Sequence, residues 1–116
     1  MAEITTAAYT ALRNYVQSNW KYIELQDETG AKIVRLTTTD NRVTFAIEGN
    51  NVKFTVIIKG SDADIIKPKT FTKGAIYDVP TGGTPYSIET FDNPFIMTQD
   101  QDELTVTLTI KVPQVM

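Results

Sequence analysis

The chain contains no histidine and no cysteine among its 116 residues. Histidine is the side chain that titrates near neutral pH without help from its surroundings, and cysteine is the readiest nucleophile and soft metal ligand. Most acid–base, catalytic-triad and zinc chemistries are therefore excluded, and no disulfide can stabilise the fold. The serines have no histidine to activate them. A lysine-based mechanism stays open without positive support, so we predict no catalytic residue and no enzyme.

Runs of basic residues and long apolar runs are also missing. The 11 Lys and Arg residues are scattered among 14 acidic residues, and the net charge is −3, whereas nucleic-acid binding needs a clustered basic face. No stretch approaches the roughly 20 apolar residues that cross a bilayer. The first residues lack the charged and hydrophobic regions of a signal peptide. We therefore expect no nucleic-acid partner, no membrane partner and synthesis in the cytoplasm.

Threonines and alternating apolar residues are abundant instead. The chain has 18 threonines, and 41% of its residues are hydrophobic, which is ordinary for a globular protein. Its length is close to the commonest size of a single domain. We expect one domain over 1–116, made of an N-terminal helix at about 6–18, a β-domain at 20–112 and a short C-terminal tail at 113–116.

The N-terminal segment carries the only strong helical pattern in the sequence. Its apolar residues recur at spacings of three and four, at Tyr9, Leu12, Val16 and Trp20. Thr5 is a suitable N-cap, because its hydroxyl can accept a hydrogen bond from an amide of the first turn. One apolar stripe results, which we expect to pack against a sheet.

Strand patterns cover most of the remaining chain. The predicted strands are 20–26, 31–38, 43–48, 52–59, 70–72, 75–79, 86–91, 95–98 and 104–112, of which the short middle ones are interrupted by glycine and proline. A turn at 27–30 joins strands 20–26 and 31–38 into a predicted hairpin, and a turn at 49–51 does the same for strands 43–48 and 52–59. A further turn is predicted at 92–94. The predicted fold class is mainly β, an antiparallel β-sandwich or barrel-like pair of sheets with six to eight strands and the helix at one side or end.

Acidic residues gather in three places, which are Asp27 with Glu28, Asp62 with Asp64, and Asp100, Asp102 and Glu103. Each group has oxygen atoms that suit calcium, but none follows the spaced, glycine-bearing pattern of a known calcium loop. Aspartates in turns commonly bind the local backbone instead. We predict turn-stabilising roles, no metal and no cofactor, and calcium binding is the alternative.

Segment 81–85 is rich in glycine but lacks the lysine of a phosphate-binding loop, so we predict an exposed, mobile loop. Its residues and the aromatic side chains nearby form a candidate ligand site, with Thr81, Gly82, Gly83 and Tyr86 as its members. Under this alternative function, the protein is a monomeric module that binds carbohydrate or peptide through the loop.

The last predicted strand alternates without fault between apolar residues and threonine or lysine. Its threonine face suits solvent or a face that meets another subunit. We predict that this strand and the apolar tail form an interface, through Leu104, Val106, Leu108, Ile110, Val112, Val115 and Met116. The tail has an alternative, which is to fold back onto its own sandwich.

The run from Ile4 to Trp20, the following segment 21–25 and the turn at 27–30 have an order of elements that resembles small structural proteins of tailed bacteriophages. The resemblance covers residues 3–36 and carries over no functional residue. It implies a virion component of the head (as decoration or fibre), neck, tail or baseplate, usually a symmetric oligomer without an active site. We therefore predict a non-enzymatic structural protein that assembles with itself or with other virion proteins, and a location in the virion.

Overall fold

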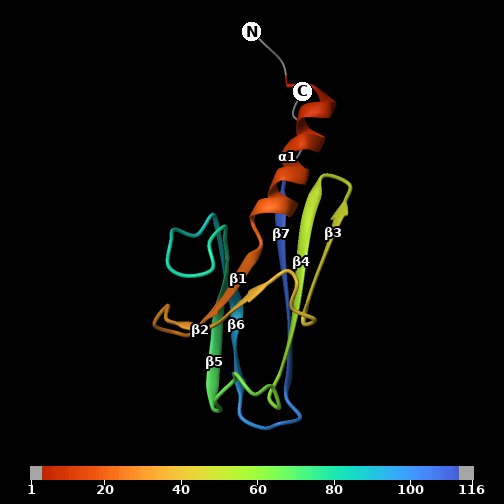
Figure 1. The fold of residues 1–116 in the computed structure, drawn as a ribbon. Helices are drawn as coiled ribbons and strands as arrows, with labels where there is room; N and C mark the ends of the chain where they lie inside the picture. The colour runs from red at the N-terminus through yellow and green to blue at the C-terminus, as the bar shows by residue number, and fades with distance from the viewer. Residues whose placement is uncertain (1–3, 113–116) are drawn as a thin grey trace.

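The computed structural model of the chain describes residues 4–112, in which one helix precedes seven strands. The helix is α1 (Thr6–Asn19), and the strands are β1 (Tyr22–Gln26), β2 (Lys32–Thr37), β3 (Val43–Glu48), β4 (Asn51–Lys59), β5 (Lys69–Tyr77), β6 (Ser87–Met97) and β7 (Glu103–Lys111). They form two antiparallel sheets with the strand orders β2-β1-β5-β6 and β3-β4-β7 (Figure 1). The prediction of a mainly β, sandwich-like fold with one N-terminal helix is confirmed.

The core lies between the two sheets, because alternate residues of each strand point to the same face. Ile23 and Leu25 of β1, Phe54 and Val56 of β4 and Phe71 of β5 are all completely buried. They belong to one apolar cluster that draws on both sheets. The molecule is elongated, with principal dimensions of 54 × 26 × 26 Å.

Helix α1 lies at one end of the sandwich, beside the ends of β4 and β7 (Figure 1). As predicted, the Thr5 hydroxyl caps it by accepting a hydrogen bond from the Ala8 N–H at 3.2 Å. Only part of the expected stripe packs inward. Val16 is buried, whereas Leu12 is 47% exposed, and Tyr15 beside the stripe is 59% exposed. The helix ends at Asn19, one residue beyond the predicted end.

Arg13 is the buried residue of α1 that the apolar pattern does not reveal. Its guanidinium donates a hydrogen bond of 2.8 Å to the Val112 carbonyl and one of 3.3 Å to the Thr10 hydroxyl. Since Val112 follows β7 directly, Arg13 joins the helix to the end of that strand.

Both predicted hairpins of the first half are present. β1 pairs with β2, and β3 pairs with β4 in a register that runs without a break from Val43 opposite Val56 to Glu48 opposite Asn51. The two hairpins lie in different sheets.

The predicted break between 72 and 75 is wrong, because β5 runs continuously through Gly74. A glycine weakens a strand in isolation, but here it lets β5 approach a neighbour. A β-carbon at this position would lie only 3.0 Å from a methyl group of Leu108. Tertiary packing therefore overrides the local signal.

The predicted turn at 92–94 is also wrong, since β6 continues through it. Phe71 faces Phe95 and Lys73 faces Thr90, so four residues of β6 stand opposite one residue of β5. Residues 91–94 are thus a bulge within a continuous strand. Proline is tolerated there because β6 is an edge strand, whose outward N–H groups need no partner in the ladder.

Candidate functional site

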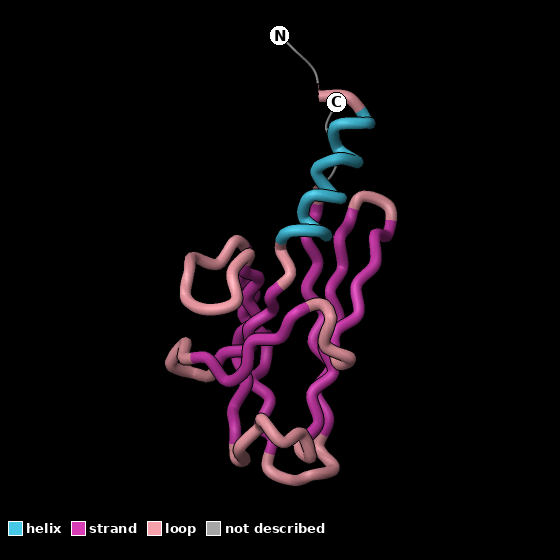
Figure 2. Tube along the Cα trace, viewed as in Figure 1, coloured by secondary structure: helices cyan, strands magenta, loops and turns pink. Residues whose placement is uncertain are grey.

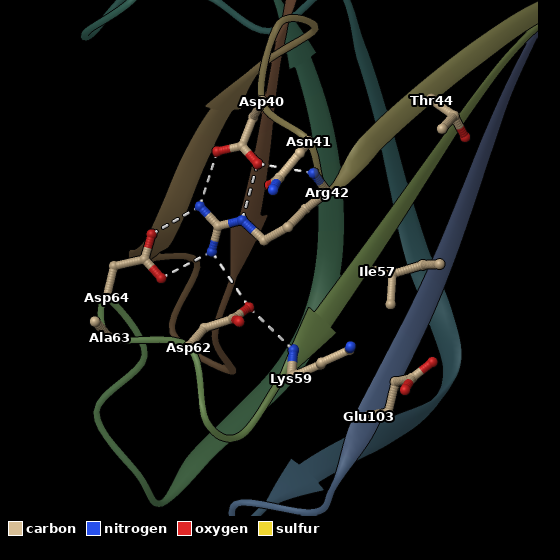
Figure 3. A pocket seen from close by; sticks show the side chains of 10 residues that line it. All are labelled: Asp40, Asn41, Arg42, Thr44, Ile57, Lys59, Asp62, Ala63, Asp64 and Glu103. Atoms are coloured by element: carbon tan, nitrogen blue, oxygen red, sulfur yellow. Dashed lines mark hydrogen bonds and ion pairs between the residues drawn. The ribbon is translucent and has the colours of Figure 1, made fainter.

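A pocket of about 720 Å³ lies on the outer face of the sheet β3-β4-β7, at the loops that lead into and out of it. Thr44, Ile57 and Lys59 form its floor, and Glu103 lies at one side (Figure 3). The opposite wall is a cluster of three aspartates around Arg42, which we call the Arg42 cluster: Asp40, Arg42, Asp62 and Asp64.

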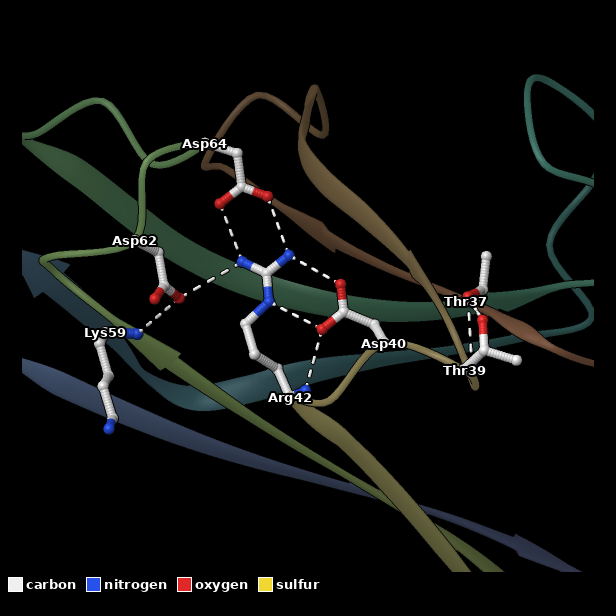
Figure 4. A network of polar contacts seen from close by, with 7 residues as sticks. All are labelled: Thr37, Thr39, Asp40, Arg42, Lys59, Asp62 and Asp64. Carbon is white, nitrogen blue, oxygen red and sulfur yellow. Dashed lines mark hydrogen bonds and ion pairs between the residues drawn. The ribbon is translucent and has the colours of Figure 1, made fainter.

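The Arg42 guanidinium uses all of its hydrogen-bonding capacity within this cluster (Figure 4). It makes two bonds to each of Asp40 and Asp64, of 2.8–3.0 Å, and one of 3.3 Å to Asp62. A guanidinium has five N–H donors, so none is left for a ligand. The arrangement joins the β2–β3 turn to the β4–β5 loop, which indicates a structural clamp.

Electrostatics agree with this role. Hydrogen bonding to Arg42 lowers the pKa of Asp40 and that of Asp64, and burial opposes the shift in both. The pKa of Arg42 is raised in turn, mainly by its hydrogen bonds to Asp40 and Asp64. Asp40, Asp64 and Arg42 are thus held in their charged forms at neutral pH.

The other acidic turns show the turn-stabilising role that the sequence predicts. The Asp27 carboxylate accepts hydrogen bonds from the N–H groups of Thr29 and Ala31 at 2.8 and 3.0 Å. Asp102 accepts in the same way from Thr98 and Gln99. The pKa of Asp27 is lowered mainly by a hydrogen bond from the Thr29 hydroxyl and further by these N–H groups, and the pKa of Asp102 is lowered by the N–H groups of Thr98 and Gln99. Within residues 4–112, no three acidic side chains are grouped in a way that could hold a metal ion.

The predicted ligand loop is exposed but anchored. Thr81, Gly82 and Gly83 lie at the surface, and the Arg35 guanidinium donates hydrogen bonds to the carbonyls of Val79 and Gly82 at 3.0 and 2.9 Å. Tyr86, at the end of the loop, is 51% exposed. Its ring lies 5.1 Å from that of Trp20, so a small aromatic surface adjoins the loop.

Arg35 also belongs to a buried polar cluster beneath the loop. It forms an ion pair of 2.9 Å with Glu24, and both side chains are 7% exposed. Its guanidinium carbon lies 3.6 Å from the centre of the Tyr77 ring, and Gln26 donates to Glu24 at 2.7 Å. Burial and the Glu24 charge raise the pKa of the Tyr77 phenol. In the part of the chain that is described, no buried side-chain nitrogen or oxygen lacks a partner.

The predicted interface residues of β7 and of the segment after it divide into three groups. Val106 and Leu108 are 4% and 3% exposed, so they are core residues and not surface residues. Leu104 and Ile110 are half-buried and pack against the core. Val112 is also half-buried. The reason is the alternation itself, which turns one face of β7 inward opposite β4. Val115 and Met116 lie outside the described residues.

Strand β7 is nevertheless the edge of its sheet and borders a groove. The groove measures about 310 Å³ and runs between β6 and β7, lined on one side by Phe91 and Phe95 and on the other by Leu104 and Val106. The threonines of β7 lie on the exposed face, as predicted. What β7 offers a partner is therefore its backbone edge, its polar face and this groove.

The chain matched no protein-family model, no curated protein sequence and no solved structure. No helix within the described part has the length and apolarity to cross a membrane.

No local sequence pattern marks the three arginines that organise the structure, which are Arg13, Arg35 and Arg42. Their partners lie 11 to 99 residues away along the chain in most cases, so no local spacing could reveal them.

Proposed function

We propose that the protein is a non-enzymatic assembly protein that acts by joining its β-sandwich to other subunits, in the simplest case further copies of itself. The observation that carries this proposal is the edge strand β7. It pairs with β4 over nine residues without a register shift, and its other side has no partner strand among residues 4–112. Such an edge is a ready template for pairing with another chain.

The other edge strands of the described structure differ from β7. β6 carries the bulge at 91–94 and Pro94, which are common devices against unwanted pairing. β2 and β3 have only six residues each. The edge of β7 is thus long, regular and free of such protection.

The polar clusters support a role without catalysis. Arg42 is saturated by carboxylates, and the buried Glu24 is held by Arg35 and Gln26. Both sets of contacts connect segments of the fold, so these charged groups are engaged in holding it together. The proposal that the assembly is a tailed-bacteriophage virion rests on the resemblance of residues 3–36 to structural proteins of such particles.

A monomeric recognition module is the second candidate. It is favoured by the aromatic surface formed by Trp20 and Tyr86 and by the exposed ring of Tyr15 on α1. Exposed aromatic rings suit sugars and peptides. This candidate predicts a monomer whose ligand-induced changes are confined to 81–86.

Absolute mass by light scattering after size exclusion, over a hundredfold range of concentration, tests the proposal. The assembly protein should exceed the monomer mass of 13.0 kDa and dissociate on dilution. A chain that ends at Lys111 serves as a second sample, to show whether the tail contributes. A mass of one chain at every concentration would contradict self-assembly and favour the recognition module.

A further inference from the structure

The free edge of β7 carries a defined set of backbone groups. At the two ends of the β4–β7 ladder, the Gly60 N–H donates to the Asp102 carbonyl and the Val112 N–H donates to the Asn50 carbonyl. Alternate residues of an antiparallel strand bond to the same neighbour, and the register is unbroken between these ends. The even-numbered residues of β7 therefore bond to β4. The odd-numbered ones, Glu103 to Lys111, direct their N–H and C=O groups outward.

The charges on this edge are placed symmetrically about its centre. Glu103 is the first residue of β7, Lys111 is the last, and the outward positions between them are Thr105, Thr107 and Thr109. Both charged side chains are exposed, and neither forms an ion pair or side-chain hydrogen bond within residues 4–112. The acidic group lies four residues before Thr107 and the basic group four residues after it. In a second, antiparallel copy of the strand these charges are reversed in order, so each would face its opposite.

We propose that β7 binds β7 of a second copy of this chain, antiparallel, about a two-fold axis at Thr107. This inference rests on the proposed function and specifies its interface. Glu103 stands opposite the partner's Lys111, Thr105 opposite the partner's Thr109, and Thr107 opposite itself. Since all five positions point their backbone outward, each opposed pair exchanges two hydrogen bonds. The two three-stranded sheets become one sheet of six strands, and the contact is closed by its symmetry.

The faces of the two strands match in this register. Leu104 lies opposite the partner's Ile110 and Val106 opposite the partner's Leu108, so apolar meets apolar on the inner face. Leu104 and Ile110 are only half-buried in one chain. A second strand along this edge adjoins the groove that Phe91 and Phe95 line, which adds apolar burial to the backbone bonds.

Other registers lose these features. A shift of one residue places the outward backbone groups of one strand opposite groups of the partner that already bond to its own β4. It also moves the partner's apolar side chains to the exposed face of the sheet and its threonines to the inner face. A shift of two residues keeps the backbone pairing but places Glu103 opposite a threonine. The central register is the one that both pairs all five outward residues and joins the opposite charges.

Single cysteines test the axis, because the native chain has none. A hydrogen-bonded pair has Cα atoms about 5.5 Å apart, so Thr107→Cys should form a covalent dimer with an oxidant or a short bifunctional thiol reagent. Thr105→Cys is the matched control on the same face, since two copies of it would lie about 14 Å apart. It should not form a dimer alone but should cross-link in a mixture with Thr109→Cys. Equal cross-linking of Thr105→Cys and Thr107→Cys alone would overturn the register.

Charge reversal tests the ends. Glu103→Lys replaces two attractive contacts by two repulsive ones, and it should weaken dimerisation roughly tenfold. The double variant Glu103→Lys with Lys111→Glu restores the complementarity and should recover dimerisation. Glu28→Lys, in the exposed turn between β1 and β2 of the other sheet, is the control for the same change in net charge. A double variant as weak as the single one would contradict the proposed pairing.

The two proposals fail in different ways. If the mass of the wild type exceeds one chain while Thr107→Cys does not cross-link, the β7 register is wrong and assembly occurs through another surface. If the wild type has the mass of one chain at every concentration and Thr107→Cys does not cross-link, self-assembly itself is wrong. Circular dichroism of each variant confirms that the sandwich is folded.

Discussion

Arg42 shows how single residues hold the loops of this sandwich in place. It follows the β2–β3 turn, and its guanidinium binds Asp62 and Asp64 of the β4–β5 loop. The side chain of Arg42 is 20% exposed, so its hydrogen bonds are partly shielded from water. Charge-assisted, bidentate bonds of this kind are the stronger class of hydrogen bond in proteins.

We expect Arg42→Gln to lower the free energy of unfolding by about 2 kcal/mol, because it leaves three carboxylates close together without a cation. Arg42→Lys should recover only part of this loss, since an ammonium cannot make the two bidentate contacts. Urea unfolding measures both. Unchanged stability in Arg42→Gln would show that the cluster is not a clamp.

The same cluster predicts a dependence of stability on pH. The folded-state pKa values of Asp40 and Asp64 lie below the ordinary value of 3.8. These groups therefore stabilise the fold above that value, and their contribution is lost as the pH falls below about 5 and through the lowered pKa values. Unfolding of the wild type and of Arg42→Gln between pH 7 and pH 3 measures this. The wild type should lose more stability than the variant, and parallel curves would contradict the assignment.

Glu24 and Arg35 form the most buried ion pair of the described residues. Arg35→Met should destabilise the protein by about 3 kcal/mol, because it leaves a buried carboxylate without its cation. The double variant Glu24→Gln with Arg35→Met should lose less than the two single changes together. Lys32→Met, exposed on the same strand, is the control and should stay within about 0.5 kcal/mol of the wild type. Additive losses would mean that the pair is not coupled.

At the scale of the elements, the local pattern predicted those whose partners are near in sequence. α1 and the β1–β2 and β3–β4 hairpins follow from apolar spacing and turn residues, and their bounds differ by at most two residues from those observed. The full lengths of β5 and β6 do not follow from the local pattern, because Gly74 and Pro94 are residues that usually interrupt strands. The close approach of Leu108 to Gly74 and the edge position of β6 make both residues compatible with strands, and neither fact is visible in local sequence.

Gly60 follows the last residue of β4 and approaches Gln99 of the β6–β7 turn. The β4–β5 loop and the β6–β7 turn lie at the end of the sandwich opposite α1 (Figure 2). A β-carbon at Gly60 would overlap the Gln99 carbonyl oxygen. The Lys67 ammonium donates to the Gly60 carbonyl and pairs with Asp100, which ties the two loops together. The close approach leaves no room for a side chain.

We expect Gly60→Ala to cost about 3 kcal/mol, because the backbone of the β6–β7 turn must move away. Gly49→Asn is the control, since Gly49 has a positive φ of 60° and open space around it, which asparagine tolerates. Thermal unfolding compares the two. A Gly60→Ala variant as stable as Gly49→Asn would contradict the packing of this end.

At the scale of the whole molecule, sequence predicted the fold class but only part of the candidate site. The alternation of the last strand predicts an exposed threonine face, and the threonines of β7 are exposed. The prediction that Val106 and Leu108 belong to an interface is wrong, because an apolar face of a strand suits a core as well as an interface. Which side of β7 is free depends on strand order, and strand order is set by contacts between segments far apart in the chain.

The most direct test of assembly through β7 is amide hydrogen exchange measured residue by residue at high and low protein concentration. Val106 and Leu108 donate to β4 and should exchange slowly at both concentrations. Thr105, Thr107 and Thr109 point outward, so their amides should be protected at high concentration and exchange quickly on dilution. Fast exchange of these three threonines in a sample whose mass exceeds one chain would contradict the account.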